Sequence, residues 1–177
     1  MAGSRGEHSA SSESIGLPAL NALPKIAAER TMRACCSASS WVRSMVDARP
    51  FASAAELYAV ADRTCAELDN AAIDEALAGH PRIGERPAGA GGAWPRQEQA
   101  GVRTADEATR AALAAGNAEY ERRFGHVYLV SAAGRTGEEL LALLRSRLDN
   151  EREVERTIVR RELAAITRQR LERVVGR

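Results

Sequence analysis

The sequence predicts an all-α fold, a single-domain bundle of about seven or eight helices with one short extended segment. Apolar residues recur at helical spacing along most of the 177 residues, and several segments carry the residue types that start helices. Only one run, residues 126–131, has strand character. Because that run is short and has no obvious partner strand, we expect extended chain there rather than a sheet.

The first half of the chain is expected to contain four helices, over residues 20–36, 40–46, 53–68 and 71–79. The second should stop before Pro50, because a residue that precedes proline avoids the α region. Ser53-Ala-Ala-Glu56 has the form of a capping box at the start of the third. Asn70 is expected to cap the fourth, which leads to His80.

The second half should contain three more helices, over residues 104–123, 136–148 and 150–174. Thr104-Ala-Asp-Glu107 and Thr136-Gly-Glu-Glu139 have the form of capping boxes, and Asn150 is expected to open the last helix. Gly125 follows the first of these helices, at a position where glycine commonly ends one. Between the two halves, residues 80–96 are rich in glycine and proline and should be irregular.

The chain divides into an expected disordered tail, residues 1–15, which is small, polar and aperiodic, and a helical domain, residues 16–177. The three cysteines are an odd number with two adjacent, which favours reduced thiols over a disulfide framework. No apolar run is long enough to span a bilayer, and no secretory signal begins the chain. We therefore expect a cytoplasmic protein.

Composition excludes several functions. A net charge of +1 provides no field to recruit nucleic acid or an anionic membrane. Lys25 is the only lysine and lies in an unremarkable apolar segment, which argues against Schiff-base chemistry. The histidines and cysteines lack zinc-site spacing, so we expect no metal. Nucleophile-elbow, phosphate-loop and dinucleotide-binding motifs are also missing.

The remaining candidate chemistry centres on His80-Pro81-Arg82-Ile83-Gly84, a loop between helices. It combines a side chain that titrates near neutrality with a proline that fixes the backbone and a glycine that allows a turn. The alternative is that His80 only caps the preceding helix.

Glu98 and Gln99 follow the glycine-rich stretch, where a carboxylate could share a proton with His80 and a carboxamide could bind a polar ligand. The alternative is an exposed first helical turn. Arg147, near the end of its helix, could clamp a carboxylate or simply complement the helix dipole.

Several segments form an ordered set over roughly residues 17–175: Cys35-Cys36 with Trp41-Val42, Arg49-Pro50-Phe51, His80-Pro81-Arg82-Ile83-Gly84, Glu98-Gln99-Ala100-Gly101, Asn117-x-x-Tyr120, Phe124-Gly125, Arg147-Leu148-x-Asn150, and the Glu/Ile/Arg-Leu pattern of the last helix. In order and spacing this set resembles the 2-oxo-4-hydroxy-4-carboxy-5-ureidoimidazoline (OHCU) decarboxylase family. The resemblance implies an all-α homodimer without a cofactor, which converts a ureidoimidazoline carboxylate to (S)-allantoin in urate degradation.

Carried over by position, the resemblance makes His80 the general acid, Glu98 its orienting partner and Arg147 the group that holds an anionic or carbonyl part of the substrate. It also implies that the substrate pocket is lined by Pro81, Gln99, Val130 and Ser131.

One position departs from the family pattern, because Pro95 stands where the family has a serine. The missing hydroxyl would cost about 0.5–1.5 kcal/mol of substrate binding. The departure leaves open a related ureido or imidazoline acid as substrate. A non-catalytic helical binding module is the alternative from another class of protein.

Overall fold

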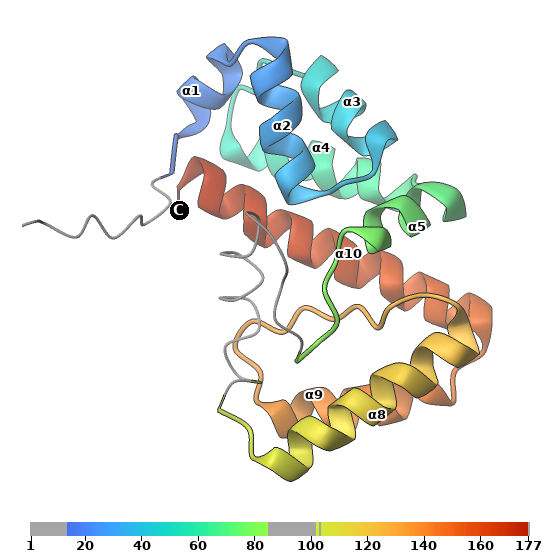
Figure 1. Cartoon of the computed structure of the whole chain (residues 1–177). Coiled ribbons are helices and arrows are strands. Elements are labelled where there is room, and N and C mark those ends of the chain that lie inside the picture. Colours follow the sequence, from blue (N-terminus) through green and yellow to red (C-terminus); the bar gives the residue numbers. More distant parts are fainter. Residues whose placement is uncertain (1–13, 85–101, 103, 177) are drawn as a thin grey trace, which may run out of the picture.

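The computed structural model describes residues 14–84, 102 and 104–176, and these residues contain eight helices (Figure 1). The helices are α1 (Leu17–Ala22), α2 (Lys25–Cys35), α3 (Ser39–Asp47), α4 (Ala54–Ala66), α5 (Asn70–Ala78), α8 (Glu107–Phe124), α9 (Gly137–Leu148) and α10 (Arg152–Val175). No strand occurs in the described part of the chain. The predicted all-α class is therefore confirmed.

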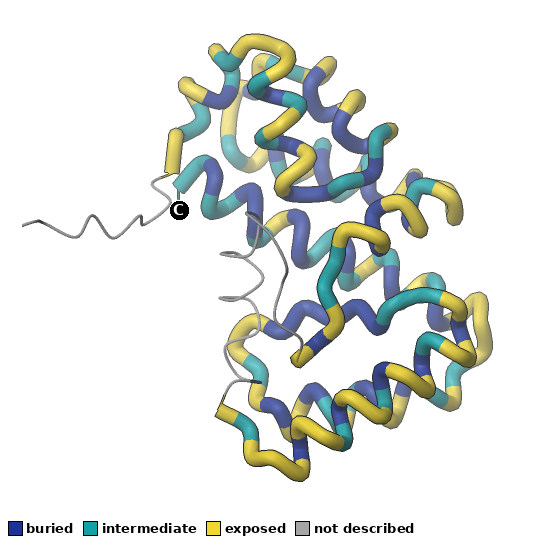
Figure 2. Tube along the Cα trace, in the orientation of Figure 1, coloured by how far each residue is buried: buried dark blue, intermediate teal, exposed yellow. Residues whose placement is uncertain are grey.

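Helix α10 is the organising element of the bundle. In Figure 1 it runs between a group formed by α1 to α5 and the pair formed by α8 and α9. One core cluster joins the first group to the inner face of α10, through side chains such as Leu163 and Leu171. A second cluster lies between α8 and α9 and includes Leu113 and Leu144. Figure 2 shows this pattern as buried stretches on the inward faces of the helices.

Two helix starts lie where the sequence predicted them, but the capping box predicted for α4 is only half formed, because the Glu56 carboxylate accepts from Ala52 N and not from Ser53 N. The Ser53 hydroxyl accepts from the amide of Glu56 at 3.1 Å, which satisfies one unpaired donor of α4. At α9 the capping box is complete, with the Thr136 hydroxyl accepting from Glu139 N and the Glu139 carboxylate accepting from Thr136 N.

Three other helix starts differ from the prediction by one or two residues. Asp69, not Asn70, caps α5 by accepting from Ala72 N at 2.8 Å. Asp106, not Thr104, caps α8. A carboxylate at the cap position accepts the third amide and complements the positive helix end, so it outcompetes the neighbouring amide or hydroxyl. Asn150 does not cap α10, because its side chain instead donates to the Glu155 carboxylate.

The predicted helix over residues 20–36 is broken into α1 and α2 at Pro24. Pro24 holds Leu23 in an extended conformation and so ends α1. The Arg49 guanidinium then donates to the carbonyls of Leu20 and Leu23 at 2.9 and 2.8 Å. These bonds satisfy acceptors that the end of a helix leaves open, which gives Arg49 a structural function.

The run after α8 is extended, as predicted, and it lies between the two core clusters. The Leu129 side chain packs in the cluster of α1 to α5 and α10, whereas Tyr128 and Val130 pack in the cluster of α8 and α9. Alternate side chains of an extended chain point in opposite directions, so burial on both sides produces a strand-like sequence without a sheet.

The N-terminal end of the described chain is attached to α10. The amides of Ile15 and Gly16 donate to the carbonyl of Val174 at 2.9 and 3.3 Å. The rest of the expected tail, residues 1–13, lies outside the described residues. Among the helices that the structure describes, none has the length and apolar character needed to cross a membrane.

Candidate functional site

His80 lies directly after α5, and its ring is fixed to that helix. Its backbone amide donates to Leu77 O at 3.0 Å, and its Nδ1 atom is 2.9 Å from Ala76 O. A carbonyl oxygen only accepts, so Nδ1 carries a proton in both charge states of the ring. Nε2, which is also buried, is therefore the nitrogen that gains and loses a proton.

The rest of the loop is anchored to α8. Asn117 donates from its side chain to Ile83 O at 2.9 Å, and Arg82 forms a two-bond ion pair with Glu121 at 2.6 and 2.9 Å. Gly84 has a φ of +90°, a left-handed conformation that favours glycine. These contacts explain the turn that the sequence predicted after His80.

A narrow cavity lies beside the His80 ring, between the loop, the extended segment and α10. Its lining residues in the described chain are His80, Pro81, Ile83, Tyr128, Leu129, Val130, Ala132, Ile166, Gln169 and Arg170. Its volume is about 20 Å³, which is room for roughly one water molecule.

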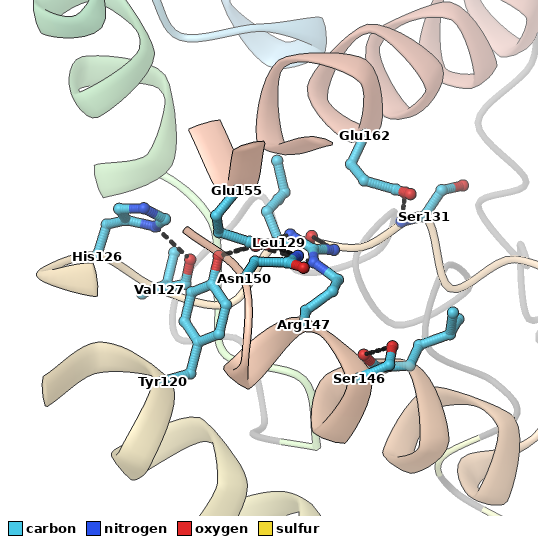
Figure 3. Close-up of polar contacts among 11 residues, drawn as sticks. Tyr120, His126, Val127, Leu129, Ser131, Ser146, Arg147, Asn150, Glu155 and Glu162 are labelled. Carbon is cyan, nitrogen blue, oxygen red and sulfur yellow. Dashed lines mark hydrogen bonds and ion pairs between the residues drawn. The ribbon is translucent and has the colours of Figure 1, made fainter. Parts of the chain in front are cut away.

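The wall made by the extended segment is supported from behind by Arg147. Its guanidinium donates to Leu129 O at 2.8 Å and to the Glu155 carboxylate at 2.5 and 2.9 Å, and it lies 4.7 Å from the centre of the Tyr128 ring. Figure 3 shows Arg147 pointing from α9 toward Glu155 of α10. Tyr120 also donates its hydroxyl to that carboxylate.

The Glu155 carboxylate is fully buried and stays ionised. Burial alone would raise its pKa, but the hydrogen bonds from Arg147, Tyr120 and Asn150 outweigh it, so the pKa lies below the usual value. Burial of the ring, and then the hydrogen bond to the same carboxylate, raise the pKa of Tyr120. This network ties α8, α9 and α10 together behind the extended segment.

Two side chains of α10 hold the next residue of the segment. Ser131 N donates to the Glu162 carboxylate at 2.7 Å, as Figure 3 shows, and Gln169 donates to the Ser131 hydroxyl at 2.9 Å. Because the described chain has no strand beside this segment, Glu162 and Arg147 satisfy backbone groups that a sheet would otherwise pair.

The structure brings three of the sequence-predicted residues together, since His80, Pro81 and Val130 all line the cavity. Ser131 is buried next to it but is not among the described lining residues. Arg147 lies behind the wall, with its guanidinium donating to protein groups. Glu98 and Gln99 lie outside the described residues, as does Pro95.

Among the lining residues that were not predicted to belong to the site, one carries a charge. Arg170, on α10, lines the cavity, is only 7% exposed, and donates to Cys35 O at 3.3 Å. It belongs to the Arg-Leu pair of the last helix that contributed to the family resemblance. That pair was the available signal, but the many other arginines of the helix obscured it.

A larger hollow of about 590 Å³ lies on the other side of the loop, against α8. It contains three arginines, but each is paired with a glutamate: Arg82 with Glu121, Arg110 with Glu107, and Arg122 with Glu119. None of its lining residues in the described part of the chain is a histidine or a cysteine. The cavity beside His80 is therefore the better candidate for acid–base chemistry.

The three cysteines are buried and form no disulfide. Burial raises the pKa of Cys36, and it raises that of Cys65 to about 12, so neither thiol is poised as a nucleophile. Across the described residues, no group of three or more histidine, cysteine or acidic side chains is arranged to hold a metal ion.

The fold and the cavity define a helical protein in which a histidine and a buried arginine lie beside a narrow cavity. The sequence model of the OHCU decarboxylase family matches residues 21–172. The chain therefore belongs to the OHCU decarboxylase family.

Curated relatives agree with this assignment. The chain is 28% identical over 151 residues to the uric acid degradation bifunctional protein TTL of Arabidopsis thaliana, covering 82% of this chain and 47% of that protein. It is 26% identical over 138 residues to the uric acid degradation bifunctional protein PucL of Bacillus subtilis (strain 168). This match covers 77% of this chain and 28% of that protein. The chain thus spans about half of the first relative and less of the second.

Solved structures show the same fold. A crystal structure of an OHCU decarboxylase in the presence of (S)-allantoin superposes with a TM-score of 0.73 at 25% identity, covering 82% of this chain and 96% of the other. A crystal structure of an (S)-allantoin synthase superposes with a TM-score of 0.66 at 13% identity, covering 89% of this chain and 53% of the other. The latter likeness concerns the fold alone.

Proposed function

We propose that this protein catalyses the decarboxylation of 2-oxo-4-hydroxy-4-carboxy-5-ureidoimidazoline to (S)-allantoin, in urate degradation and without a cofactor. The observation that carries the proposal is the His80 ring, fixed through Nδ1 to Ala76 O at the edge of the cavity. Membership of the OHCU decarboxylase family supports the substrate and the reaction.

The substrate provides its own electron sink. The carbon that loses CO2 is bonded to the carbon of a ring C=N group, and that group is conjugated with the ring 2-oxo carbonyl. As the carbon–carboxylate bond breaks, its electron pair moves into the ring, and negative charge spreads to the ring nitrogen and the 2-oxo oxygen. The protein then has to position the acid, stabilise this charge and deliver a proton to one face.

His80 is the proposed proton donor. With Nδ1 held by the helix carbonyl, the imidazolium form carries its transferable proton on Nε2. A fixed ring presents that proton from one direction, which is the requirement for a single-handed product. Glu98 is proposed to set the position of the His80 proton, and Gln99 is proposed to bind the substrate; both expectations come from the family resemblance.

The buried cation of the site is proposed to be Arg170. It lines the cavity directly, whereas Arg147 donates to Glu155 and Leu129 behind the wall. A charged guanidinium in a buried site attracts an organic acid strongly. The substrate-holding function that the resemblance gave to Arg147 stays a prediction, and its observed contacts favour a positioning function for the wall.

The pocket wall is proposed to include Pro81, Val130 and Ser131. Pro81 and Val130 line the cavity, and the two bonds from α10 to Ser131 fix the backbone next to it. We further propose a cytoplasmic homodimer, as the sequence led us to expect.

The test generates the labile substrate in place, with urate oxidase and hydroxyisourate hydrolase, and follows (S)-allantoin by circular dichroism after the protein is added. We expect single-handed product to form faster than in the spontaneous decay. An Arg170→Met variant should raise KM at least about tenfold, because it loses a charge-assisted bond. No acceleration by the wild type would refute the proposed reaction.

Pro95 supports a second candidate function, the decarboxylation of a related ureido or imidazoline acid. If the wild type is inactive on OHCU, the same assay with such acids distinguishes this candidate from a non-catalytic module. A Pro95→Ser variant that gained OHCU activity would connect the difference to that position.

A further inference from the structure

The Tyr128 hydroxyl is a buried polar group that the proposed chemistry has not used. Tyr128 is 2% exposed and lines the same cavity as His80. Its hydroxyl makes no hydrogen bond to any residue of the described chain. A buried hydroxyl without a partner destabilises a folded protein, so its presence at a cavity wall calls for a ligand that completes the bond.

The ring of Tyr128 is held firmly. It packs edge-on against Tyr120, with ring centres 5.1 Å apart, and the Arg147 guanidinium carbon lies 4.7 Å from its centre. Arg147 is in turn fixed by Glu155 and by Leu129 O. These contacts pre-organise the ring, so a ligand does not have to order the side chain.

The surroundings of the Tyr128 hydroxyl keep it protonated, so that it can donate a hydrogen bond. Burial raises the pKa of Tyr128 to about 12, although the nearby Arg147 acts in the opposite direction. Glu162 and Glu155 add to the increase, and Arg135 opposes it. The phenol is therefore protonated throughout the neutral pH range, and it can donate to an oxygen.

We propose that Tyr128 is a catalytic residue that donates a hydrogen bond from its hydroxyl to the 2-oxo oxygen of the bound ureidoimidazoline. This inference rests on the proposed function, because the 2-oxo oxygen is one of the two atoms to which negative charge spreads when CO2 leaves. The bond therefore strengthens as the reaction proceeds, and it stabilises the transition state more than the bound substrate.

The closing experiment compares the wild type with Tyr128→Phe in the coupled circular dichroism assay. The variant keeps the ring and removes only the oxygen. We expect kcat to fall at least about tenfold while KM changes less than about twofold, the pattern of a contact made mainly in the transition state. The ratio of the two kcat values should stay constant from about pH 6 to 9, because the phenol does not titrate there.

Two controls separate this effect from a structural one. Tyr128→Phe should unfold at the same temperature as the wild type or a higher one, since the lost hydroxyl has no partner to leave behind. Tyr58→Phe, a matched change on α4 at a residue that does not line the cavity, should leave both kinetic constants unchanged.

The outcomes are distinct. A Tyr128→Phe variant with wild-type kcat, or with only a raised KM, overturns the proposed function of Tyr128 while the decarboxylase activity stands. An inactive wild type overturns both proposals. A fall in kcat with unchanged thermal stability supports the hydrogen bond to the 2-oxo oxygen.

Discussion

The buried ion pair between Arg147 and Glu155 allows the loss of folding stability in a variant to be predicted in magnitude. Arg147→Met removes the guanidinium and leaves the Glu155 carboxylate fully buried, with bonds only from Tyr120 and Asn150. Removing one member of a buried pair costs about 3–5 kcal/mol, because the remaining charge loses its compensation. For a domain of this size, that corresponds to a fall in Tm of about 6–20 °C.

The measurement is thermal unfolding followed by far-ultraviolet circular dichroism. The double variant Arg147→Met/Glu155→Gln removes both charges while retaining an acceptor for Tyr120. It should recover at least half of the loss, since the uncompensated charge is gone. A single variant that unfolds within about 2 °C of the wild type, or a double variant that is less stable than the single one, would refute this account.

The pH dependence follows from the lowered pKa of Glu155 in the folded protein. A carboxyl group whose pKa is lower in the folded protein than in the unfolded chain stabilises the folded state. This stabilisation is fully present above the pKa of the unfolded chain, and it is lost as the pH falls through the pKa of the folded protein. The difference in stability between the wild type and Arg147→Met should therefore be fully developed at neutral pH and shrink in acid. A difference that grew below about pH 4 would contradict the assigned ionisation.

Three further predictions concern the framework around the site. Asp69→Ala should destabilise the protein by about 1 kcal/mol through loss of the α5 cap, whereas the control Asn70→Ala should change the unfolding free energy little. Gly137→Ala should cost about 1–3 kcal/mol in a denaturant titration, because the new Cβ would lie 2.5 Å from Ala105 Cβ, which no rotation can relieve. The thiols should resist a thiol reagent at pH 8 until denaturant is added, since they are buried and burial raises the pKa of Cys65 to about 12. Rapid labelling of the native protein would be inconsistent with these buried positions.

Much of the fold could be predicted from local sequence signals. The Ser53 cap, the capping box at Thr136 and the glycine after α8 act over a few residues, so their consequences can be read directly from the sequence. The prediction was wrong where two neighbouring residues compete for one cap, as with Asp69 and Asn70. It was also wrong at Pro24, where α1 ends and Arg49, from a distant segment, donates hydrogen bonds to the open carbonyls of that helix end.

The candidate site was less accessible to sequence reasoning. The loop of His80 and the run containing Val130 were each recognisable, but their meeting depends on how two core clusters pack around α10. The contrast between Arg147 and Arg170 is likewise a tertiary matter. Both lie in arginine-rich helices, and only the packing directs one toward Glu155 and the other toward the cavity.

The most direct test of the central claim measures the handedness of the product with His80→Ala. In the coupled circular dichroism assay, the wild type should form (S)-allantoin rapidly and almost exclusively. The folded variant should return both the rate and the handedness to those of the spontaneous decay, because no fixed Nε2 proton remains. A His80→Ala variant that still accelerates single-handed product formation would contradict the claim that His80 delivers the proton.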